Sequence, residues 1–368
     1  MKTKAKFSEP MASEKSSSRS SVLRVWLTLV FVIGLRHPLG FAQEAVVLVG
    51  SGSSVPAPLY NKWAQEYNKR NPGIQMKYVP MGASEGIKLA SHGSGDFGAG
   101  EAQLTAAERK EGNLIELPTV LIGIVPIYNL PGVHTELRFT GELLAEIFLG
   151  EVKTWNASQI AKLNPDASLP RLPIKVIYRP AGKGSNYVFS EFLSKTSSKF
   201  RTQIGTSPSP HWPVGAPAER SSDMADKVKS ETGSIGYVEA QYALKANISH
   251  GMVQNAAGKY VEASPETIKA ACHAVETPAW DKFSASLTNA PGADAFPITS
   301  FTWLYLRTTS SDPRRTAALA DLLNWMFTEG QRLASEDGYA ELPSPLLGKV
   351  KTKASSLHST NEPWNYPK

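Results

Sequence analysis

Three turns made of small residues have the composition of a ligand-binding site. Residues 50–54 (GSGSS), 82–86 (GASEG) and 182–185 (GKGS) each follow an apolar run and precede a run with helical spacing. Glycine lets the backbone approach a ligand closely, serine adds a hydroxyl donor, and the N–H groups at a helix N-terminus favour negative charge. Arg179, just before the third turn, offers a two-pronged cation suited to a tetrahedral oxyanion. One such turn is ordinary in any α/β protein, but three turns with an arginine indicate an anion site.

The elements that must position these turns repeat the order strand, turn, helix. The apolar runs predict strands over 46–49, 74–80, 96–102, 174–179 and 234–239, and helices over 56–68, 87–92, 140–148, 156–163 and 313–328. This order predicts an α/β fold with a parallel sheet and right-handed crossovers. In such sheets ligands collect at the carboxyl ends of the strands, where the three turns lie. Two longer apolar strands, 119–129 and 297–307, are expected to leave the first domain and return to it, so that two α/β lobes face each other across a cleft.

The charge of the chain is concentrated at its N-terminus. Residues 1–42 contain seven Lys/Arg and two Asp/Glu, which gives this segment a net charge of +5. The rest of the chain contains 32 Lys/Arg and 31 Asp/Glu, a net charge of +1, so the formal net charge of the whole chain is +6. The nearly neutral charge of residues 43–368 argues against a nucleic-acid partner.

The apolar run at 25–35 is shorter than the roughly 20 residues of a membrane span and follows a basic stretch, so 1–42 is interpreted as a secretory signal peptide. Because Cys272 is the one cysteine, an intramolecular disulfide is impossible and a buried thiol is expected.

Two motif matches suggest enzymes, and both are weak. Residues 82–86 fit the G-x-S-x-G nucleophile elbow of α/β-hydrolases around Ser84, but no downstream histidine has a recognisable strand-end context. A serine-directed covalent probe that labels Ser84 would support the hydrolase alternative. Residues 182–184 resemble a P-loop, yet the positions that require glycine and Ser/Thr hold Ile177 and Gly184. The histidines show no metal-ligand spacing. We therefore expect a protein that is not an enzyme and has no metal and no cofactor.

The sequence resembles the periplasmic phosphate-binding proteins of Pst-type ABC transporters. The likeness runs in order through GSGSSVPAPLYNKW (50–63), DFGAGEAQLT (96–105), LPTVLIGIVPIYN (117–129), YRPAGKGSNYVFSEFL (178–193), GSIGYVE (233–239) and FPITSFTWL (296–304). The resemblance implies the two-lobe, hinged Venus-flytrap fold. It implies a monomeric periplasmic protein that captures inorganic phosphate in the cleft and delivers it to a permease and ATPase complex. The expected organisation is a signal peptide at 1–42, lobe 1 at 43–129 plus 299–348, lobe 2 at 130–298 and a C-terminal tail at 349–368.

The resemblance carries the family's ligand donors over to Ser54, Val55, Arg179, Gly184 and Ser185. Four other family positions are altered in this chain. The serine of the second turn is replaced by Ala83 with Ser84 beside it, and the ligand-facing aspartate is replaced by Glu101. A loop serine is replaced by Lys183, and the aspartate that pairs with the arginine is replaced by Ala181.

The departures bear on which anion is bound. A carboxylate that faces the ligand accepts a hydrogen bond only from a protonated oxyanion, so it favours phosphate over sulfate. Glu101 keeps this acceptor on a longer side chain, and Ala83 removes a donor worth about 0.5–1.5 kcal/mol. Lys183 either restores that donor, pairs with Glu101 or is a solvated loop lysine. Inorganic phosphate is the expected ligand. The alternatives are another anion, such as an organic phosphate, and a sensor or interaction protein with the same fold.

Overall fold

The computed structural model describes residues 44–275, 283, 285–354 and 358–359. Residues Gln43–Lys368 form one compact unit. The segment interpreted as a signal peptide, 1–42, lies outside the described residues, as does most of the segment beyond Ala354.

An eight-stranded sheet, in the order β2-β1-β3-β11-β4-β8-β6-β7, forms the centre of this unit. Its strands are β1 (Val46–Gly52), β2 (Ile74–Pro80), β3 (Phe97–Gly100), β4 (Leu114–Tyr128), β6 (Lys175–Tyr178), β7 (Ala216–Pro217), β8 (Ser234–Glu239) and β11 (Thr299–Arg307). The outer strands pair in parallel within each half, as predicted, but β11 is antiparallel to both β3 and β4, and β4 is antiparallel to β8. The expected parallel sheet is therefore mixed, with antiparallel strands at its centre, because the chain crosses between the halves in opposite directions along β4 and β11.

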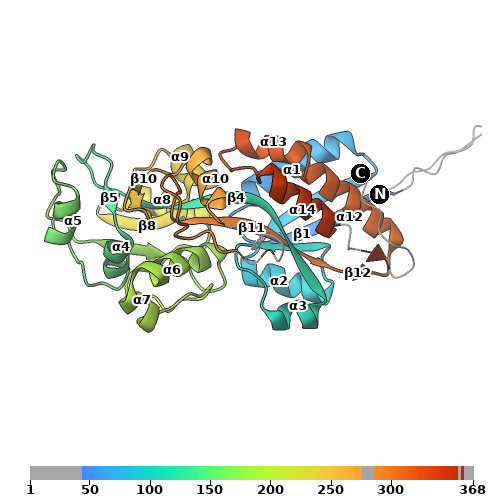
Figure 1. The fold of residues 1–368 in the computed structure, drawn as a ribbon, viewed down its shortest axis with the longest axis horizontal. Helices are drawn as coiled ribbons and strands as arrows, with labels where there is room; N and C mark the ends of the chain where they lie inside the picture. Colours follow the sequence, from blue (N-terminus) through green and yellow to red (C-terminus); the bar gives the residue numbers. More distant parts are fainter. Residues whose placement is uncertain (1–43, 276–282, 284, 355–357, 360–368) are drawn as a thin grey trace, which may run out of the picture. The chain divides into compact units, whose positions relative to one another are not determined.

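Strand β4 joins the two halves of the sheet. All 15 of its residues are buried. Residues 114–123 pair with β11, and residues 124–128 pair with β8, so the partner strand changes between Gly123 and Ile124. Figure 1 shows β4 and β11 running together from the group that holds β1 and α1 toward the group that holds β8 and α6. A strand that changes partners in this way fits the expected crossing near 119–129, while the lobe boundaries themselves stay a prediction.

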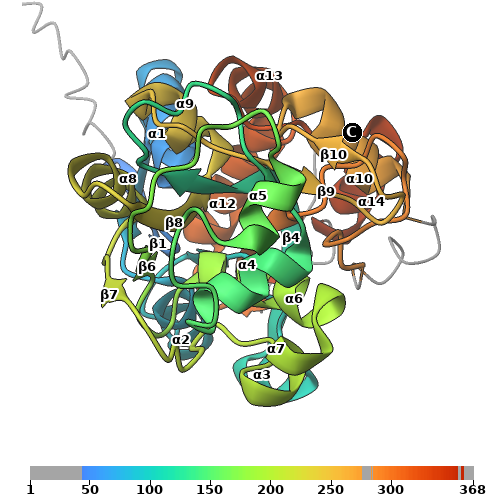
Figure 2. The ribbon, with the colours of Figure 1, turned by 90° about the vertical axis from the view of Figure 1, so that its left-hand side faces the viewer.

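Helices cover both faces of the sheet (Figures 1 and 2). They are α1 (Ala57–Arg70), α2 (Ala83–His92), α3 (Ala106–Gly112), α4 (Gly141–Phe148), α5 (Ser158–Leu163), α6 (Gly184–Thr196), α7 (Ser198–Gln203), α8 (Ser221–Ser230), α9 (Ala240–Ala246), α10 (Pro265–His273), α12 (Pro313–Met326), α13 (Glu329–Glu336) and α14 (Ser344–Ala354). Residues 349–354 continue α14, so the start of the segment expected as a tail is helical. Two small sheets complete the fold: β5 (Arg138–Phe139) with β9 (Met252–Gln254) and β10 (Tyr260–Val261), and β12 (Thr309–Ser310) with β13 (His358–Ser359).

Helix α1 shows how the sequence holds the first turn in place. Leu59, Trp63 and Tyr67 recur at helical spacing and are completely buried, as that spacing indicates. Burying each such side chain stabilises the fold by about 1.5–3 kcal/mol. The indole N–H of Trp63 also donates a hydrogen bond of 2.8 Å to the carbonyl of Gly330 at the start of α13. The N-terminus of α1, and the turn that leads into it, is therefore fixed against the rest of the molecule.

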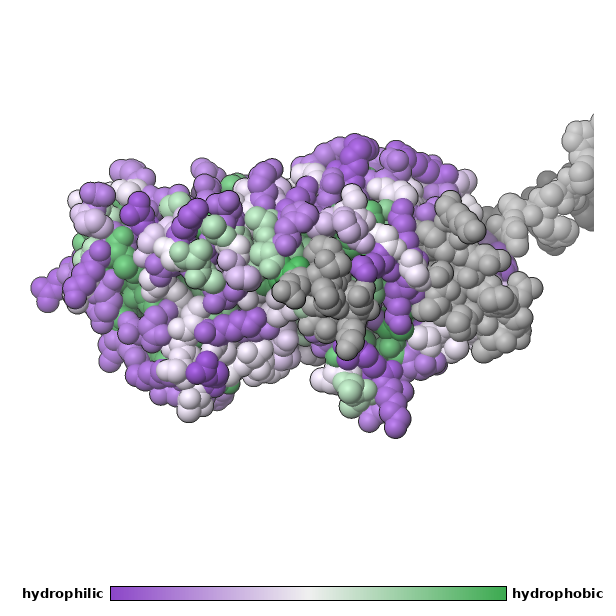
Figure 3. All heavy atoms as spheres, in the orientation of Figure 1, coloured by the Kyte–Doolittle hydropathy of each residue, from purple (hydrophilic) through white to green (hydrophobic). Residues whose placement is uncertain are grey.

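The face drawn in Figure 3 is mostly polar, and the single cysteine of the chain is buried. Polar side chains cover most of the face drawn in Figure 3, and apolar residues are seen there in small separate patches. Within the described residues, no helix combines the length and the apolar character that spanning a bilayer requires. Cys272 is buried on α10, as predicted, and burial raises the pKa of its thiol to about 12. A thiol in this state is a poor nucleophile and a poor metal ligand at neutral pH.

Candidate anion site

The three small-residue turns meet in space. The N–H groups of Met81 and Gly82 donate to the carbonyl of Gly52, at 2.7 and 2.8 Å, and the N–H of Ser84 donates to the carbonyl of Gly182 at 3.3 Å. Gly82 has a φ of +111°, and a Cβ there would lie 3.3 Å from the carbonyl oxygen of Gly182. A residue without a side chain is thus needed where the second turn approaches the third.

Helices α1, α2 and α6 begin at these turns and present their first N–H groups there. In the described part of the chain none of the three has a side-chain cap, whereas α3, α4 and α10 are capped by Thr105, Thr140 and Ser264. Uncapped N–H groups at a helix N-terminus attract anions because they carry the positive end of the helix dipole. The hydrogen bonds between the turns bring these three helix ends close together in the structure.

Arg179 stands at the end of β6 with only 2% of its surface exposed. Its Nη1 donates to the hydroxyl of Ser221 at 3.2 Å, and its Nη2 donates to the hydroxyl of Ser54 at 3.2 Å and to the carbonyl of Glu219 at 2.8 Å. The hydroxyls of Ser54 and Ser221 lie 3.3 Å apart. The Nε–H of Arg179 has no partner among the described residues. A buried guanidinium that is held by neutral groups and has its Nε–H unpaired is suited to an anionic ligand.

The backbone around Arg179 is held by a buried network. The N–H of Arg179 donates to the hydroxyl of Tyr237 at 3.1 Å, and that hydroxyl donates to the side-chain carbonyl of Asn186. The amide nitrogen of Asn186 in turn donates to the carbonyls of Arg179 and Pro180, at 3.0 and 2.7 Å. This closed network fixes the course of the loop between β6 and α6, and with it the direction of the guanidinium.

Glu101 follows β3 and lies against the start of α6. Its side chain is 1% exposed, and neither carboxylate oxygen accepts a hydrogen bond from a described residue. A Cβ on Gly184 would come within 1.5 Å of its Oε2, so the contact requires glycine at that position. Burial raises the pKa of Glu101 to about 8, the nearby hydroxyl of Ser53 and the charge of Arg179 oppose the rise, and the charge of Glu239 adds to it. The carboxyl group therefore holds its proton at neutral pH when no ligand is bound.

Further polar groups of the site are buried without partners in the described structure. The hydroxyl of Ser185, on the first turn of α6, is one of them. Both carboxylate oxygens of Glu239, at the end of β8, are others. Burial also raises the pKa of Glu239, and the nearby Arg179 opposes this. Buried donors and acceptors without partners are rare in native proteins. Their concentration around Arg179 and Glu101 indicates a site that a ligand completes.

The other predicted site residues have structural partners of their own. The N–H of Val55 donates to the hydroxyl of Ser53 at 3.1 Å. Ala83 is buried and packs against Gly100, where a Cβ would lie 2.8 Å from the Ala83 Cβ. Ser84 faces the third turn, since a Cβ on Gly182 would lie 3.6 Å from its Oγ. None of the described histidines hydrogen-bonds to Ser84, so the hydrolase elbow lacks a base here.

Lys183 pairs with Glu219. Its Nζ lies 3.1 Å from the Glu219 Oε2, and the lysine side chain is 17% exposed. The alternative in which Lys183 pairs with Glu101 is therefore wrong in this structure, and so is that of a freely solvated lysine. Sequence reasoning missed Ser221, Glu219 and Glu239. Glu239 alone has a local signal, because it ends the buried strand at 234–239 on the edge of the sheet where ligands collect.

Comparisons with known proteins show the family and the fold of the chain. A family profile described as "PBP superfamily domain" matches residues 40–329. Phosphate-binding protein PstS of Xylella fastidiosa (strain 9a5c) is 34% identical over 315 residues, covering 85% of this chain and 86% of that protein. PstS of Haemophilus influenzae is 34% identical over 316 residues, covering 86% and 94%. The solved structure of a high-affinity periplasmic phosphate-binding protein bound with phosphate shares the fold, with a TM-score of 0.65, 17% identity and coverage of 83% and 93%.

Proposed function

This chain belongs to the family of PstS phosphate-binding proteins, and we propose that its buried site captures inorganic phosphate for an ABC transporter. Proteins of this family bind and carry a solute and are not enzymes. The observation that carries the proposal is the buried set of donors without partners, Arg179 Nε and Ser185 Oγ, beside the carboxyl group of Glu101. Such a set matches a tetrahedral anion that also carries a proton.

In the proposed complex, oxygens of phosphate accept hydrogen bonds from Arg179, from the hydroxyls of Ser54 and Ser185, and from the uncapped N–H groups of α1 and α6. One hydrogen bond joins a phosphate oxygen to the carboxyl group of Glu101, through a proton that either partner can supply. Because the site is buried, each charged hydrogen bond there is stronger than it would be in water. Val55, Ala83, Ser84, Lys183 and Gly184 line the same site in this proposal, with Gly184 making room for Glu101.

We further propose that capture proceeds by hinge closure. The turns of the first half of the sheet contact those of the second half through Ser54 with Arg179, Glu101 with Gly184, and Ser84 with Gly182. Strands β4 and β11 link the two halves, so bending near 122–129 and 297–303 would open and close the site. In this proposal the lobes are 43–129 with 299–348, and 130–298.

The chain is homologous to extracytoplasmic binding proteins. We propose that residues 1–42 direct its export to the periplasm, where it works as a monomer and delivers phosphate to a permease and ATPase complex. Stimulation of the ATPase activity of that complex by the loaded protein, compared with the ligand-free protein, tests delivery separately from binding.

The test of the ligand is calorimetric titration after partial unfolding and dialysis, which strip any bound anion. Three arms use phosphate, sulfate and glycerol phosphate at neutral pH. Tight 1:1 binding of phosphate supports the proposal. Preference for glycerol phosphate would favour an organic phosphate, an alternative motivated by Ala83 and Lys183. No response to any of the three would contradict an oxyanion site of this kind.

A further inference from the structure

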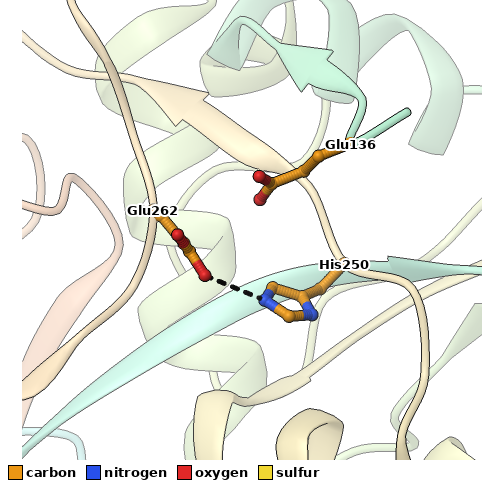
Figure 4. Close-up of side chains that lie close together, drawn as sticks. All are labelled: Glu136, His250 and Glu262. Carbon is orange, nitrogen blue, oxygen red and sulfur yellow. Dashed lines mark ion pairs between the residues drawn. The ribbon is translucent and has the colours of Figure 1, made fainter. Parts of the chain in front are cut away.

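A second group of ligating side chains shares no residue with the anion site. Glu136, His250 and Glu262 point toward one another (Figure 4), and one ligand atom of each lies within 4.8 Å of the other two. Glu136 and Glu262 are exposed, and His250 is half-buried. Histidine spacing in the sequence indicated no metal site, because the ligands here are one histidine and two glutamates from separate segments.

The backbone places all three residues at the end of the small sheet β10-β9-β5. Strands β5 and β9 are parallel, with Arg138 opposite Met252, so Glu136 and His250 each lie two residues before that pair. Glu262 follows β10, which runs antiparallel to β9. His250 is also bridged to Ile127 of the central strand β4. All three residues lie in loop segments directly next to paired strands, and the small sheet fixes the chain on that side of each residue.

The imidazole of His250 is oriented for metal binding. Its Nδ1 lies 3.2 Å from the carbonyl of Ile248, and the Nδ1–H donates to it. This contact turns Nε2 toward the glutamates, where it can act as a metal ligand. The Nε2 lies 3.7 Å from the Oε1 of Glu262, too far for a good hydrogen bond. Two ligands about 2.0–2.2 Å from one Zn²⁺ in tetrahedral geometry stand about 3.4 Å apart. Because the three ligand atoms here lie within 4.8 Å of one another, the exposed glutamate side chains must move inward for all three to bind one ion.

The charge of the group also favours a cation. Within the described part of the chain, neither glutamate forms an ion pair with a lysine or an arginine, and Glu262 pairs only with His250. Two glutamate side chains without a lysine or arginine partner thus face one imidazole, and one divalent ion can neutralise both carboxylates.

We propose that Glu136, His250 and Glu262 form a binding site for a divalent transition-metal ion, with Zn²⁺ as the reference ligand and water in the remaining position. The imidazole nitrogen selects Zn²⁺ and similar ions over Mg²⁺ and Ca²⁺, which prefer oxygen ligands. The ion ties together three segments, which end at β5, β9 and β10. Since it binds the folded chain and not the unfolded one, it raises the unfolding temperature.

The test uses the purified protein without a histidine tag, stripped by chelator and kept in phosphate-free buffer. Zn²⁺ is titrated, bound metal is counted by mass spectrometry after dialysis, and thermal unfolding is followed with and without Zn²⁺. We expect one Zn²⁺ per chain and a rise in unfolding temperature. His250→Gln and Glu262→Gln should each lower affinity at least about tenfold, since even outer partners of metal ligands are worth roughly 10–100-fold.

The matched control is His92→Gln. His92 is exposed on α2, and its Nδ1 likewise lies 2.8 Å from a backbone carbonyl, that of Lys88, but no described carboxylate pairs with it. This variant should bind Zn²⁺ as the unaltered protein does. Unchanged phosphate binding in every variant shows that each one folds. No retained Zn²⁺ in the unaltered protein, or equal losses in His92→Gln and His250→Gln, would overturn the proposal.

Discussion

Replacing Glu101 by glutamine tests the electrostatics of the buried site. In an unfolded chain this carboxyl group ionises near its ordinary pKa of 4.5, whereas in the folded, ligand-free protein it keeps its proton up to a pKa of about 8. Between these two values the folded state binds more protons than the unfolded state. The free energy of unfolding therefore falls as the pH rises through this window, and below about pH 4.5 the effect is absent.

The size of the effect follows from the two pKa values. Each pH unit spent between them removes about 1.4 kcal/mol, so Glu101 lowers the free energy of unfolding by about 3 kcal/mol at pH 7 and about 5 kcal/mol at pH 9. Glutamine does not ionise, so the Glu101→Gln variant should lack this part of the pH dependence. Its amide is also buried without partners, which shifts stability by a constant amount at every pH. The diagnostic quantity is therefore the slope against pH.

The assay is urea unfolding of phosphate-stripped protein at intervals from pH 5 to pH 9. The difference in free energy of unfolding between Glu101→Gln and the unaltered protein should grow steadily in favour of the variant up to about pH 8. Glu219→Gln is the matched control, because it makes the same chemical change in the same region on a side chain that is 68% exposed. Its curve should run parallel to that of the unaltered protein. Parallel curves for Glu101→Gln as well would refute the reasoning and mean that water reaches Glu101 in the ligand-free protein.

Three further predictions concern the same site. Arg179→Lys should weaken phosphate binding by more than about a hundredfold in calorimetry, because an ammonium group cannot replace the planar guanidinium that Ser54 and Ser221 hold. The thermal unfolding curve of this variant should stay cooperative. A loss of affinity below about tenfold would contradict the assignment of Arg179 to the site. Gly184→Ala should weaken phosphate binding by about ten- to a hundredfold, since its Cβ would displace Glu101 at a free-energy cost of about 1–3 kcal/mol. Gly73→Ala, where the added Cβ meets open space, should leave the affinity unchanged. Equal affinities for the two variants would show that the Glu101 side chain can move away from residue 184 without cost. Sulfate carries no proton, so its binding needs the protonated form of Glu101. The affinity for sulfate should therefore fall about tenfold per pH unit above about pH 8, while the affinity for phosphate changes far less. Equal pH profiles for the two anions would contradict the role of Glu101.

Local features of the fold could be predicted from the sequence because local chemistry decides them. Strands β2 and β8 have the predicted bounds, 74–80 and 234–239, since turn-forming residues and helix starts flank their apolar residues. Thr105 caps α3 through a capping box with Glu108, as its place before the helix indicates. The antiparallel centre of the sheet could not be predicted in this way. The pairing of β4 with β11 joins segments almost 200 residues apart, and apolar runs carry no direction.

Some site residues could likewise be predicted from local sequence, and others could not. Ser54, Arg179 and Ser185 lie in turns with a local pattern, and the structure brings the turns together. The hydroxyl of Ser221 and the carbonyl of Glu219 reach Arg179 only because α8 begins beside β6 and β8, which no nearby residue reveals. The partner of Lys183 depends on the same packing. The replacement of the family's aspartate by Glu101 is visible in the sequence. The burial of Glu101 against Gly184 and the raised pKa of its carboxyl group follow only from contacts in the folded structure.

The position of β11 sets the order in which the molecule can assemble. This strand lies between β3 and β4, yet it is formed by residues 299–307, long after both neighbours in the chain. A chain that emerges N-terminus first, from a ribosome or from a translocation pore, has β1 to β4 available early but leaves the edges of β3 and β4 unpaired. Unpaired edges invite aggregation, and long-range pairing is slow. Most of the polypeptide must therefore be held unfolded until about its last fifth arrives, and truncation before residue 299 should leave even the N-terminal half unable to fold.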